Sequence, residues 1–181
     1  MRPRLKAGIV GSGFIAEVHA RAIRAAGHEV YGIATSSEAG AELAAERLDA
    51  TRSFSSWQEL VNCSEVDVVH VCTPNELHVE ISVAAAKAGK HVICEKPISV
   101  SLDQALELQN EISEAAVGFA VPFAYRFYPM VREMRARILN GEAGKIHLFQ
   151  GNYLQDWLAD PESSNWRVDS SAGGASRAFA D

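Results

Sequence analysis

The sequence predicts an α/β fold, a Rossmann-like doubly wound parallel sheet followed by the start of an α+β domain with an open antiparallel sheet. Short apolar runs alternate with segments of helical spacing, and the connections between them are short. The run VDVVHVC (66–72) is apolar at nearly every position, which is typical of a strand covered on both faces. After about residue 122 this alternation stops, which indicates a change of domain.

The first half of the pattern gives three strands. LKAGIV (5–10) ends at a glycine, and helical spacing follows at Phe14, Val18, Ala22 and Ala26 until Gly27 stops the helix. EVYGIA (29–34) is the second predicted strand, followed by an alanine-rich helix over about 38–48. A short strand near 51–54 and a helix from about Ser56 come next.

The second half continues in the same order. After the strand at 66–72, a helix over about 77–89 has Leu77, Ile81, Ala85 and Ala88 on one face. HVIC (91–94) is the fifth strand. Ser101 and Gln104 form a capping box for a helix whose apolar residues include Leu102 and Leu108, and VGFAV (117–121) is the sixth strand. Right-handed crossovers between such units produce a doubly wound sheet.

We place the domain boundary near 122–128, with a first domain at 1–122 and an incomplete second domain at 123–181. Pro129 opens a helix with Val131, Met134 and Ile138, and NGEAG (140–144) ends it. KIHLFQGNYL (145–154) is predicted to be a long strand. The chain is therefore expected to stop partway into its second domain.

Composition excludes several classes of protein. The formal net charge of −6 argues against a general nucleic-acid binder, which needs a basic face. No apolar run approaches the length of a membrane span, and the basic start lacks the apolar core of a signal peptide. The three cysteines (Cys63, Cys72 and Cys94) are widely spaced, so neither a disulfide framework nor a metal site is expected, and a reduced cytoplasmic location is the default.

A GxGxxA fingerprint follows the first strand, formed by Gly11, Ser12, Gly13, Phe14, Ile15 and Ala16. Gly11 permits a tight turn, Gly13 lets the backbone approach a pyrophosphate, and Ala16 lets the helix pack close to the strand. Phosphates would then lie at the helix N-terminus. The motif predicts dinucleotide binding because it lies between a first strand and a first helix. No GKS or GKT is present, which excludes a P-loop.

The residues after the second strand bear on the choice of dinucleotide. NAD-preferring sites usually offer Asp or Glu to the ribose hydroxyls, whereas this chain has Thr35, Ser36 and Ser37. Neutral hydroxyls do not repel a 2′-phosphate, although no Arg or Lys is present there to attract one. We expect NADP(H) or NAD(H), with a slight preference for NADP(H); helix capping by Ser36 or Ser37 is compatible with either.

Polar residues also follow the fourth and fifth strands. Cys72, Thr73, Pro74 and Asn75 end the fourth strand, with His78 one turn later, and Glu95-Lys96-Pro97 follows the fifth. Active residues of doubly wound sheets lie at the carboxyl ends of strands. A turn and helix cap would also account for Thr-Pro-Asn. A lysine directed into the crevice is harder to explain without a partner or a function, because its burial costs desolvation energy.

Together these motifs resemble the Gfo/Idh/MocA family of NAD(P)-dependent sugar and polyol dehydrogenases, over essentially the whole chain. The segments that carry the resemblance are GSGFIA, CTPNELH, EKP, AYRFYP and DWLADPESSNWRVDSSAGGASRAFAD. The resemblance implies hydride transfer between the cofactor and a hydroxyl or carbonyl of a cyclic sugar or polyol. It also implies oligomerisation of the whole protein through the sheet of its second domain.

The resemblance further implies roles for individual residues. Lys96 is the implied catalytic lysine, Pro97 is implied to be cis, and Glu95 to hold the lysine. Thr73, Pro74, Asn75 and His78 would line the nicotinamide side. Candidate substrate contacts, which also suit packing at a domain seam, are Tyr125, Arg126, Trp166 and Arg167.

The family's second catalytic segment has the form D-x-x-x-H, in which the histidine carries the proton. Asp181 falls where its aspartate should be, and the histidine is absent from this sequence. We therefore expect the 181-residue polypeptide by itself to be inactive, although the protein it comes from would be an enzyme.

Two other functions compete with a dehydrogenase. A non-catalytic sensor or scaffold that binds a nicotinamide nucleotide would not need Lys96 and Asp181. A Rossmann methyltransferase would normally have an acidic residue after the second strand and would have no use for Glu-Lys-Pro.

Overall fold

The computed structural model describes residues 3–154, 156, 159–160 and 162. The described residues form two compact units, one ending at Pro122 and the other beginning at Phe123. Each unit is described by itself. Predicted residues Trp166, Arg167 and Asp181 lie outside the described residues.

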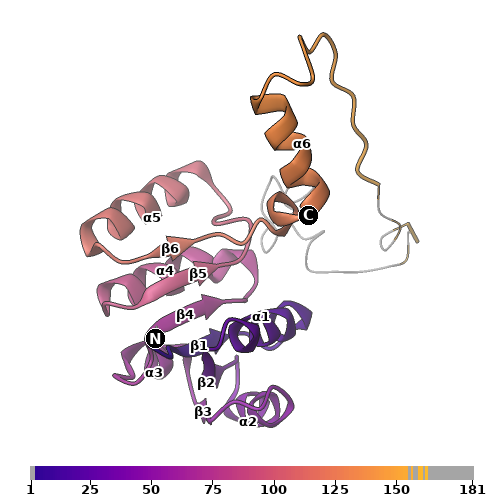
Figure 1. The fold of residues 1–181 in the computed structure, drawn as a ribbon. Helices are drawn as coiled ribbons and strands as arrows, with labels where there is room; N and C mark the ends of the chain where they lie inside the picture. The colour runs from indigo at the N-terminus through magenta and orange to yellow at the C-terminus, as the bar shows by residue number, and fades with distance from the viewer. Residues whose placement is uncertain (1–2, 155, 157–158, 161, 163–181) are drawn as a thin grey trace. The chain divides into compact units, whose positions relative to one another are not determined.

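The first unit is built on a six-stranded parallel sheet with the strand order β3-β2-β1-β4-β5-β6 (Figure 1). Its strands are β1 (Lys6–Val10), β2 (Glu29–Ala34), β3 (Arg52–Phe54), β4 (Val68–Val71), β5 (His91–Cys94) and β6 (Phe119–Ala120). The order reverses between β1 and β4, and such a switch point is where open α/β sheets bind their ligands. The predicted fold class is confirmed, although β4 and β6 are shorter than expected.

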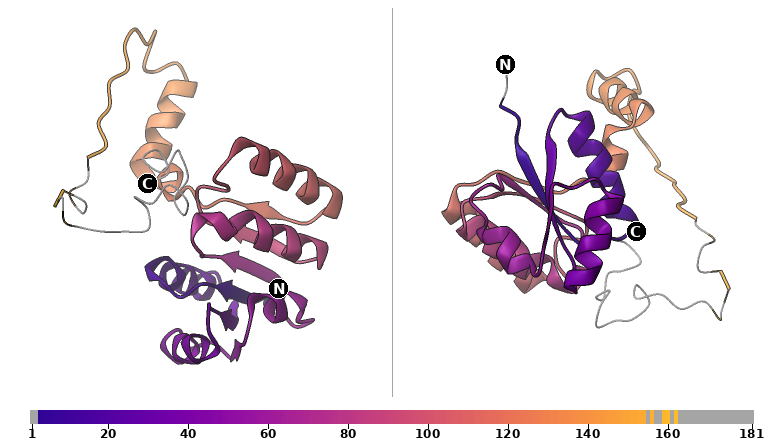
Figure 2. Two further views of the ribbon diagram at one scale, coloured as in Figure 1. Left: turned by 180° about the vertical axis from the view of Figure 1, so that it is seen from behind. Right: turned by 90° about the horizontal axis from the view of Figure 1, so that it is seen from below.

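Helices cover both faces of the sheet (Figure 2). Helices α1 (Phe14–Ala25) and α2 (Glu38–Arg47) lie on one face, and α3 (Trp57–Asn62), α4 (His78–Lys87) and α5 (Leu102–Ala115) on the other. A 3₁₀ turn, η1 (Asn75–Leu77), precedes α4. This two-sided cover explains why every residue of β4 is buried.

Two apolar clusters, one on each face, hold the layers together. Ala16, Ala20 and Ile23 of α1 pack on Ile9 and Ile33 of the sheet. On the opposite face, the cluster is formed by residues of β4, α3 and α4, among them Val69, Val71, Leu60, Ile81 and Ala85. Burial of such side chains contributes roughly 1.5–3 kcal/mol each, so these clusters are the main stabilising contribution.

The helix that follows the glycine motif uses a different face from the one predicted. Phe14 and Val18 are exposed, and the core face is formed by Ala16, His19, Ala20 and Ile23. The small side chains at Ala16 and Ala20 allow the helix to lie close to the sheet, which the larger Phe14 would prevent. The helical spacing of apolar residues that begins at Phe14 therefore does not mark the buried face of α1.

Serine side chains cap three of the helices. Ser37, Ser56 and Ser101 begin α2, α3 and α5, and each accepts a hydrogen bond from the backbone N–H three residues later. Of the two candidate caps Ser36 and Ser37, Ser37 caps α2. The cap at Ser101 is confirmed by the bond from the Gln104 N–H. In α5, however, Leu102 is exposed and Leu108 alone of the helix is buried.

The second unit contains a 3₁₀ turn, η2 (Ala124–Phe127), and helix α6 (Pro129–Leu139). Pro129 opens α6 as predicted. The predicted strand at 145–154 is wrong: the segment is exposed and forms no ladder. A strand needs a neighbour for its backbone N–H and C=O groups, and no described segment pairs with this one.

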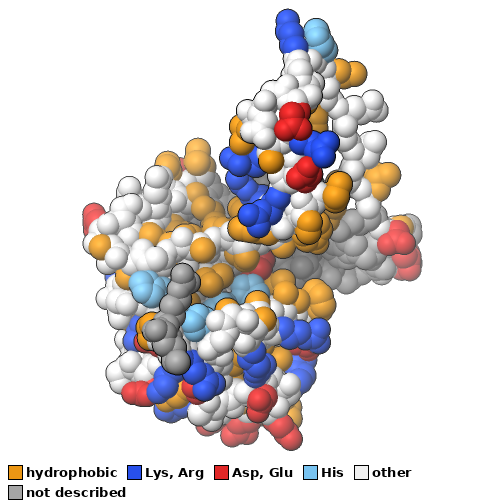
Figure 3. Space-filling model, in the orientation of Figure 1, with side chains coloured by type: hydrophobic (Ala, Val, Ile, Leu, Met, Phe, Trp, Pro, Cys, Tyr) orange, Lys and Arg blue, Asp and Glu red, His pale blue; other side chains and the backbone are white. Residues whose placement is uncertain are grey.

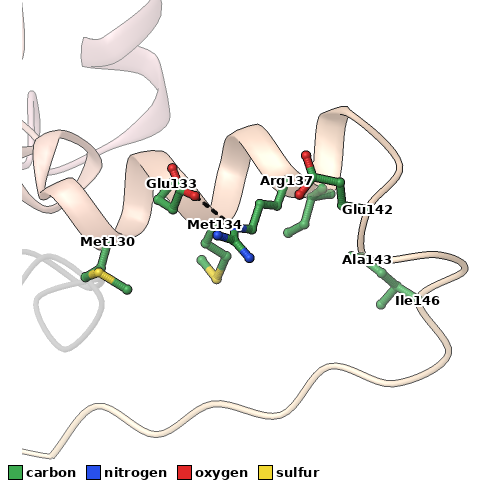
Figure 4. A pocket seen from close by; sticks show the side chains of 8 residues that line it. Met130, Glu133, Met134, Arg137, Glu142, Ala143 and Ile146 are labelled. Carbon is green, nitrogen blue, oxygen red and sulfur yellow. Dashed lines mark hydrogen bonds and ion pairs between the residues drawn. The ribbon is translucent and has the colours of Figure 1, made fainter.

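Helix α6 and the segment after it border a shallow groove (Figure 4). Met130, Met134, Ile138 and Ile146 supply its apolar wall, and Arg137 on its rim donates to Glu133 at 2.8 Å. None of the predicted site residues that the structure describes lines this groove.

In the part of Figure 3 that corresponds to α2 and α3 in Figure 1, positively and negatively charged side chains are interspersed. Among the described residues, no helix is long and apolar enough to cross a membrane.

Candidate functional site at the carboxyl edge of the sheet

Gly11 ends β1 in a conformation that requires glycine. Its φ is +109°, and its N–H donates to the carbonyl oxygen of Ala34 at 2.8 Å. A Cβ atom at this position would lie 2.4 Å from the carbonyl oxygen of Cys72, a backbone atom that cannot move aside. The ends of β1, β2 and β4 thus meet at Gly11, and the turn depends on its missing side chain.

We expect Gly11→Ala to lower the free energy of unfolding by on the order of 3 kcal/mol, because it combines a strained φ with a backbone clash. Gly89→Ala is the matched control, because Gly89 has a φ of +74° but no atom within 4 Å of an added Cβ. It should cost about 1 kcal/mol. Urea unfolding measures both; equal losses would show that the close approach to Cys72 is unimportant.

Gly13 differs from Gly11, because no described residue requires a glycine there. Its φ of −72° and ψ of −176° suit any residue, and an added Cβ would meet no atom of the described residues within 4 Å. Gly13 is the N-cap of α1, and within the part of the chain that the structure describes no side chain caps this helix end. Backbone N–H groups without intrahelical partners therefore remain at a helix N-terminus, beside open space that suits a phosphate.

The neighbouring residues of the motif complete this cradle. Ala16 is fully buried, so α1 packs close to the sheet, whereas the Phe14 side chain is 80% exposed and Ile15 is partly buried. Arg47 of α2 donates to the carbonyl oxygen of Ser12 and forms an ion pair with Glu17 at 3.2 Å. These contacts tie the glycine turn to α1 and α2.

The turn after β2 uses two of its three hydroxyls internally. Thr35 Oγ1 donates to the carbonyl oxygen of Ser37 at 2.8 Å, and Ser37 Oγ accepts from the N–H of Gly40. The side chain of Ser36 is exposed. Of the predicted pair Thr35 and Ser36, Ser36 is therefore the better placed to meet a ligand.

The loops that follow β4 and β5 are joined by His78, which is 1% exposed. Its Nδ1 lies 2.6 Å from the carbonyl oxygen of Pro97, and its Nε2 lies 2.9 Å from that of Thr73. His78 therefore positions the two loops; its ring nitrogens are occupied by backbone groups. Asn75 is also buried, and Pro74 is exposed.

The Thr73 hydroxyl is buried and has no hydrogen-bond partner within the described residues. Such a group costs free energy unless a ligand or water completes it. Thr73 follows the carboxyl end of β4, and β4 pairs with β1, the strand that leads into the glycine turn. This orphaned hydroxyl and the open space at Gly13 both fit a dinucleotide held along this edge.

The two thiols near this edge are unreactive by environment. Burial raises the pKa of the Cys72 thiol well above its ordinary value, and the Glu95 charge raises it further. Burial likewise raises the pKa of Cys94 to about 12. Neither sulfur is a thiolate at neutral pH, so Cys72 contributes shape to the site rather than a nucleophile.

Glu95 and Lys96 follow β5 directly. Glu95 is 8% exposed, and its Oε2 accepts from the backbone N–H of Lys96 at 3.2 Å. Lys96 is partly exposed, and the Lys96–Pro97 peptide bond is cis, as the family resemblance implied. The sheet order therefore brings Lys96 to the edge that carries the glycine turn, with β4 between them.

Two buried histidines beside Glu95 were not predicted from the sequence. His19 of α1 has its Nε2 2.9 Å from Glu95 Oε1 and its Nδ1 2.8 Å from Nδ1 of His70, on β4. Burial, followed by the charge of His19, lowers the pKa of His70 to about 3. The sequence does contain a sign of this buried polar cluster, because His70 is the one polar residue of the apolar strand VVHV.

The predicted substrate contacts fall in the second unit or outside the described residues. Tyr125 and Arg126 belong to η2, and both are exposed. The Tyr125 hydroxyl lies 2.7 Å from that of Tyr153, so it has a partner within its own unit. The substrate roles of Tyr125, Arg126, Trp166 and Arg167 and the catalytic role of Asp181 stay predictions.

Comparison with known proteins identifies the family. Residues 5–123 match GFO_IDH_MocA, described as the oxidoreductase family with an NAD-binding Rossmann fold. The chain belongs to this family. The predicted resemblance is thereby confirmed, and the glycine turn lies inside the matched region.

Several relatives within the Gfo/Idh/MocA family are known. Levoglucosan dehydrogenase of Pseudarthrobacter phenanthrenivorans is 36% identical, over 94% of this chain and 46% of its own length. For 1,5-anhydro-D-fructose reductase of Ensifer adhaerens the identity is 38%, over 90% of this chain and 48% of the relative. The chain thus spans about half the length of these curated relatives.

A solved structure also resembles the chain in its fold. Levoglucosan dehydrogenase in complex with NADH and levoglucosan superposes with a TM-score of 0.91 at 36% identity, covering 96% of this chain and 50% of that one. The similarity therefore includes the Rossmann unit of an enzyme that was solved with a nicotinamide cofactor.

Proposed function

We propose that the protein to which this chain belongs transfers hydride between a nicotinamide cofactor and a hydroxyl or carbonyl carbon of a cyclic sugar or polyol. Gly13 carries the argument: its backbone does not need glycine, and among the described residues none caps this helix N-terminus or lies within 4 Å of a Cβ added at Gly13. Family membership supports the proposed reaction. The two relatives described above are named for anhydro-sugars, which supports a cyclic sugar as the substrate.

The cofactor supplies the hydride acceptor or donor, and the residues of the chain supply its binding and the charge stabilisation. In this proposal the N–H groups after Gly13 hold the pyrophosphate, and Thr73, Pro74 and Asn75 border the nicotinamide. The Lys96 ammonium hydrogen-bonds the reacting oxygen and stabilises negative charge as it develops there. Asp181 orients a proton carrier, and Tyr125, Arg126, Trp166 and Arg167 approach the substrate.

The test is binding followed by turnover. The chain should bind NADH or NADPH, which is measured by quenching of protein fluorescence or by calorimetry. The protein to which it belongs should then reduce the oxidised cofactor when a cyclic sugar or polyol is added. Binding without turnover across a panel of such substrates would contradict the dehydrogenase and favour a sensor.

We further propose that the turn after β2 accepts NADP(H) as well as NAD(H), because Ser36 is exposed and neutral. Ser36→Asp places a carboxylate where a 2′-phosphate would lie. It should shift the NADP(H)/NAD(H) affinity ratio towards NAD(H) by at least about tenfold, or 1.4 kcal/mol. Titrations with both cofactors measure this ratio, with Ser36→Asn as the neutral control. An unchanged ratio would show that Ser36 faces away from the ribose.

A further inference from the structure

Three polar side chains form a buried cluster between α1 and the sheet. His19, His70 and Glu95 are all buried. His19 lies on α1, His70 on β4, and Glu95 directly after β5. Val69, Val71 and Cys94 belong to the apolar cluster on the opposite face. Because side chains alternate along a strand, His70 and Glu95 face α1 instead.

The hydrogen bonds of this cluster have a defined direction at one end. A carboxylate only accepts, so His19 Nε2 donates to Glu95 Oε1 at 2.9 Å, and the Lys96 N–H donates to Oε2 at 3.2 Å. At the other end, Nδ1 of His19 and Nδ1 of His70 share a hydrogen bond of 2.8 Å. Both carboxylate oxygens of Glu95 are therefore held by named donors.

A purely structural role explains this cluster poorly. Burying polar groups at this position costs desolvation energy, and apolar side chains of similar volume could fill the space. No group of three or more His, Cys, Asp and Glu side chains in the described part of the chain has the geometry to hold a metal ion. What the cluster does is fix a buried carboxylate next to Lys96.

We propose that His19 is a positioning residue, which fixes the Glu95 carboxylate and, through it, the Lys96 segment at the carboxyl edge of the sheet. His70 completes the cluster by holding the other side of the His19 ring. The catalytic meaning of this role rests on the proposed function, in which Lys96 meets the reacting oxygen. The positioning itself concerns the described residues alone and is testable without cofactor.

Two variants of His19 separate its two hydrogen bonds. The Gln amide nitrogen occupies about the place of Nε2, so His19→Gln keeps a donor for Glu95. The Asn amide occupies about the place of Nδ1, so His19→Asn keeps the partner of His70 and removes the donor for Glu95. A third variant, Glu95→Gln, removes the negative charge of the Glu95 side chain.

The readout is the rate at which the Lys96 ε-amine reacts with trace acetic anhydride at one fixed pH. The full chain is labelled without cofactor and analysed by residue-resolved mass spectrometry, with exposed Lys87 as the internal reference. The observed contact joins Glu95 to the Lys96 backbone N–H, and we expect the Lys96 ammonium to respond to the same carboxylate. In His19→Asn the carboxylate loses a donor, so Lys96 should react at least about threefold more slowly. In Glu95→Gln it should react faster, and His19→Gln should restore the wild-type rate.

The outcomes distinguish the proposals. Equal Lys96 rates in all variants would overturn the positioning role, and so would a slow His19→Gln, which would assign the effect to ring packing. If His19→Asn does not fold, Glu95→Gln and His19→Gln still decide. Protection of Lys96 by NADH in the wild type is measured separately; its absence would count against the proposed function and leave the role of His19 intact.

Discussion

Gly13→Val should lower the affinity of the chain for NAD(H) and NADP(H) by about 100-fold or more, equivalent to ~2.7 kcal/mol. The valine side chain would occupy the space that is open at the N-terminus of α1. The valine side chain would keep a pyrophosphate away from the backbone N–H groups at the start of α1. Charge-assisted hydrogen bonds between these N–H groups and the phosphate oxygens would then be lost.

The same variant should leave the fold intact, which makes the test specific. The φ and ψ of Gly13 suit valine, and an added Cβ meets no atom within 4 Å in the described ranges. We expect the free energy of unfolding to fall by about 1 kcal/mol or less, the usual cost of a poor N-cap. Gly13→Ala, which adds a single methyl group, should show an intermediate loss of affinity. Wild-type affinity in Gly13→Val would contradict the dinucleotide site.

Lys96→Ala should lower kcat by roughly 10²–10⁴ in the protein to which this chain belongs, the scale expected for a positioned charge-stabilising group. Cofactor affinity should change far less, because the proposed phosphate contacts lie at the glycine turn. Steady-state kinetics and a cofactor titration on the same preparation give the two numbers.

The control for this experiment is Lys87→Ala. Lys87 is an exposed lysine of α4, paired with Glu111 at 2.9 Å, and it takes no part in the proposed site. Its loss should leave kcat unchanged. Near-normal kcat in Lys96→Ala, or a parallel loss of stability and cofactor affinity, would assign Lys96 a structural role instead.

Local chemistry determines the elements that were predicted correctly. The strands at 29–34 and 91–94 have the predicted bounds, because a continuous apolar run between turn residues leaves few alternatives. Ser37 and Ser101 cap their helices because a serine hydroxyl reaches a backbone N–H three residues later, whatever packs against the helix.

Predictions failed where the outcome depends on distant residues. The apolar segment at 145–154 has the composition of a strand but forms none, because a strand needs the backbone of a neighbour. The buried face of α1 is set by how closely the helix approaches the sheet, so Ala16 and Ala20 are inside and Phe14 is outside.

The sequence by itself indicated the parallel sheet, the dinucleotide motif and the family, because each is recognised from short local segments: apolar runs that alternate with helical spacing, the glycine motif, and several short motifs in a fixed order. The tertiary structure alone decided which of the two glycines the fold requires: Cys72, 61 residues after Gly11, excludes a side chain at Gly11, whereas no described residue lies within 4 Å of a Cβ added at Gly13. It also decided that His19 meets His70 and Glu95, which are 51 and 76 residues away. Contacts of this kind follow from the strand order, and the spacing of residues along one segment does not encode them.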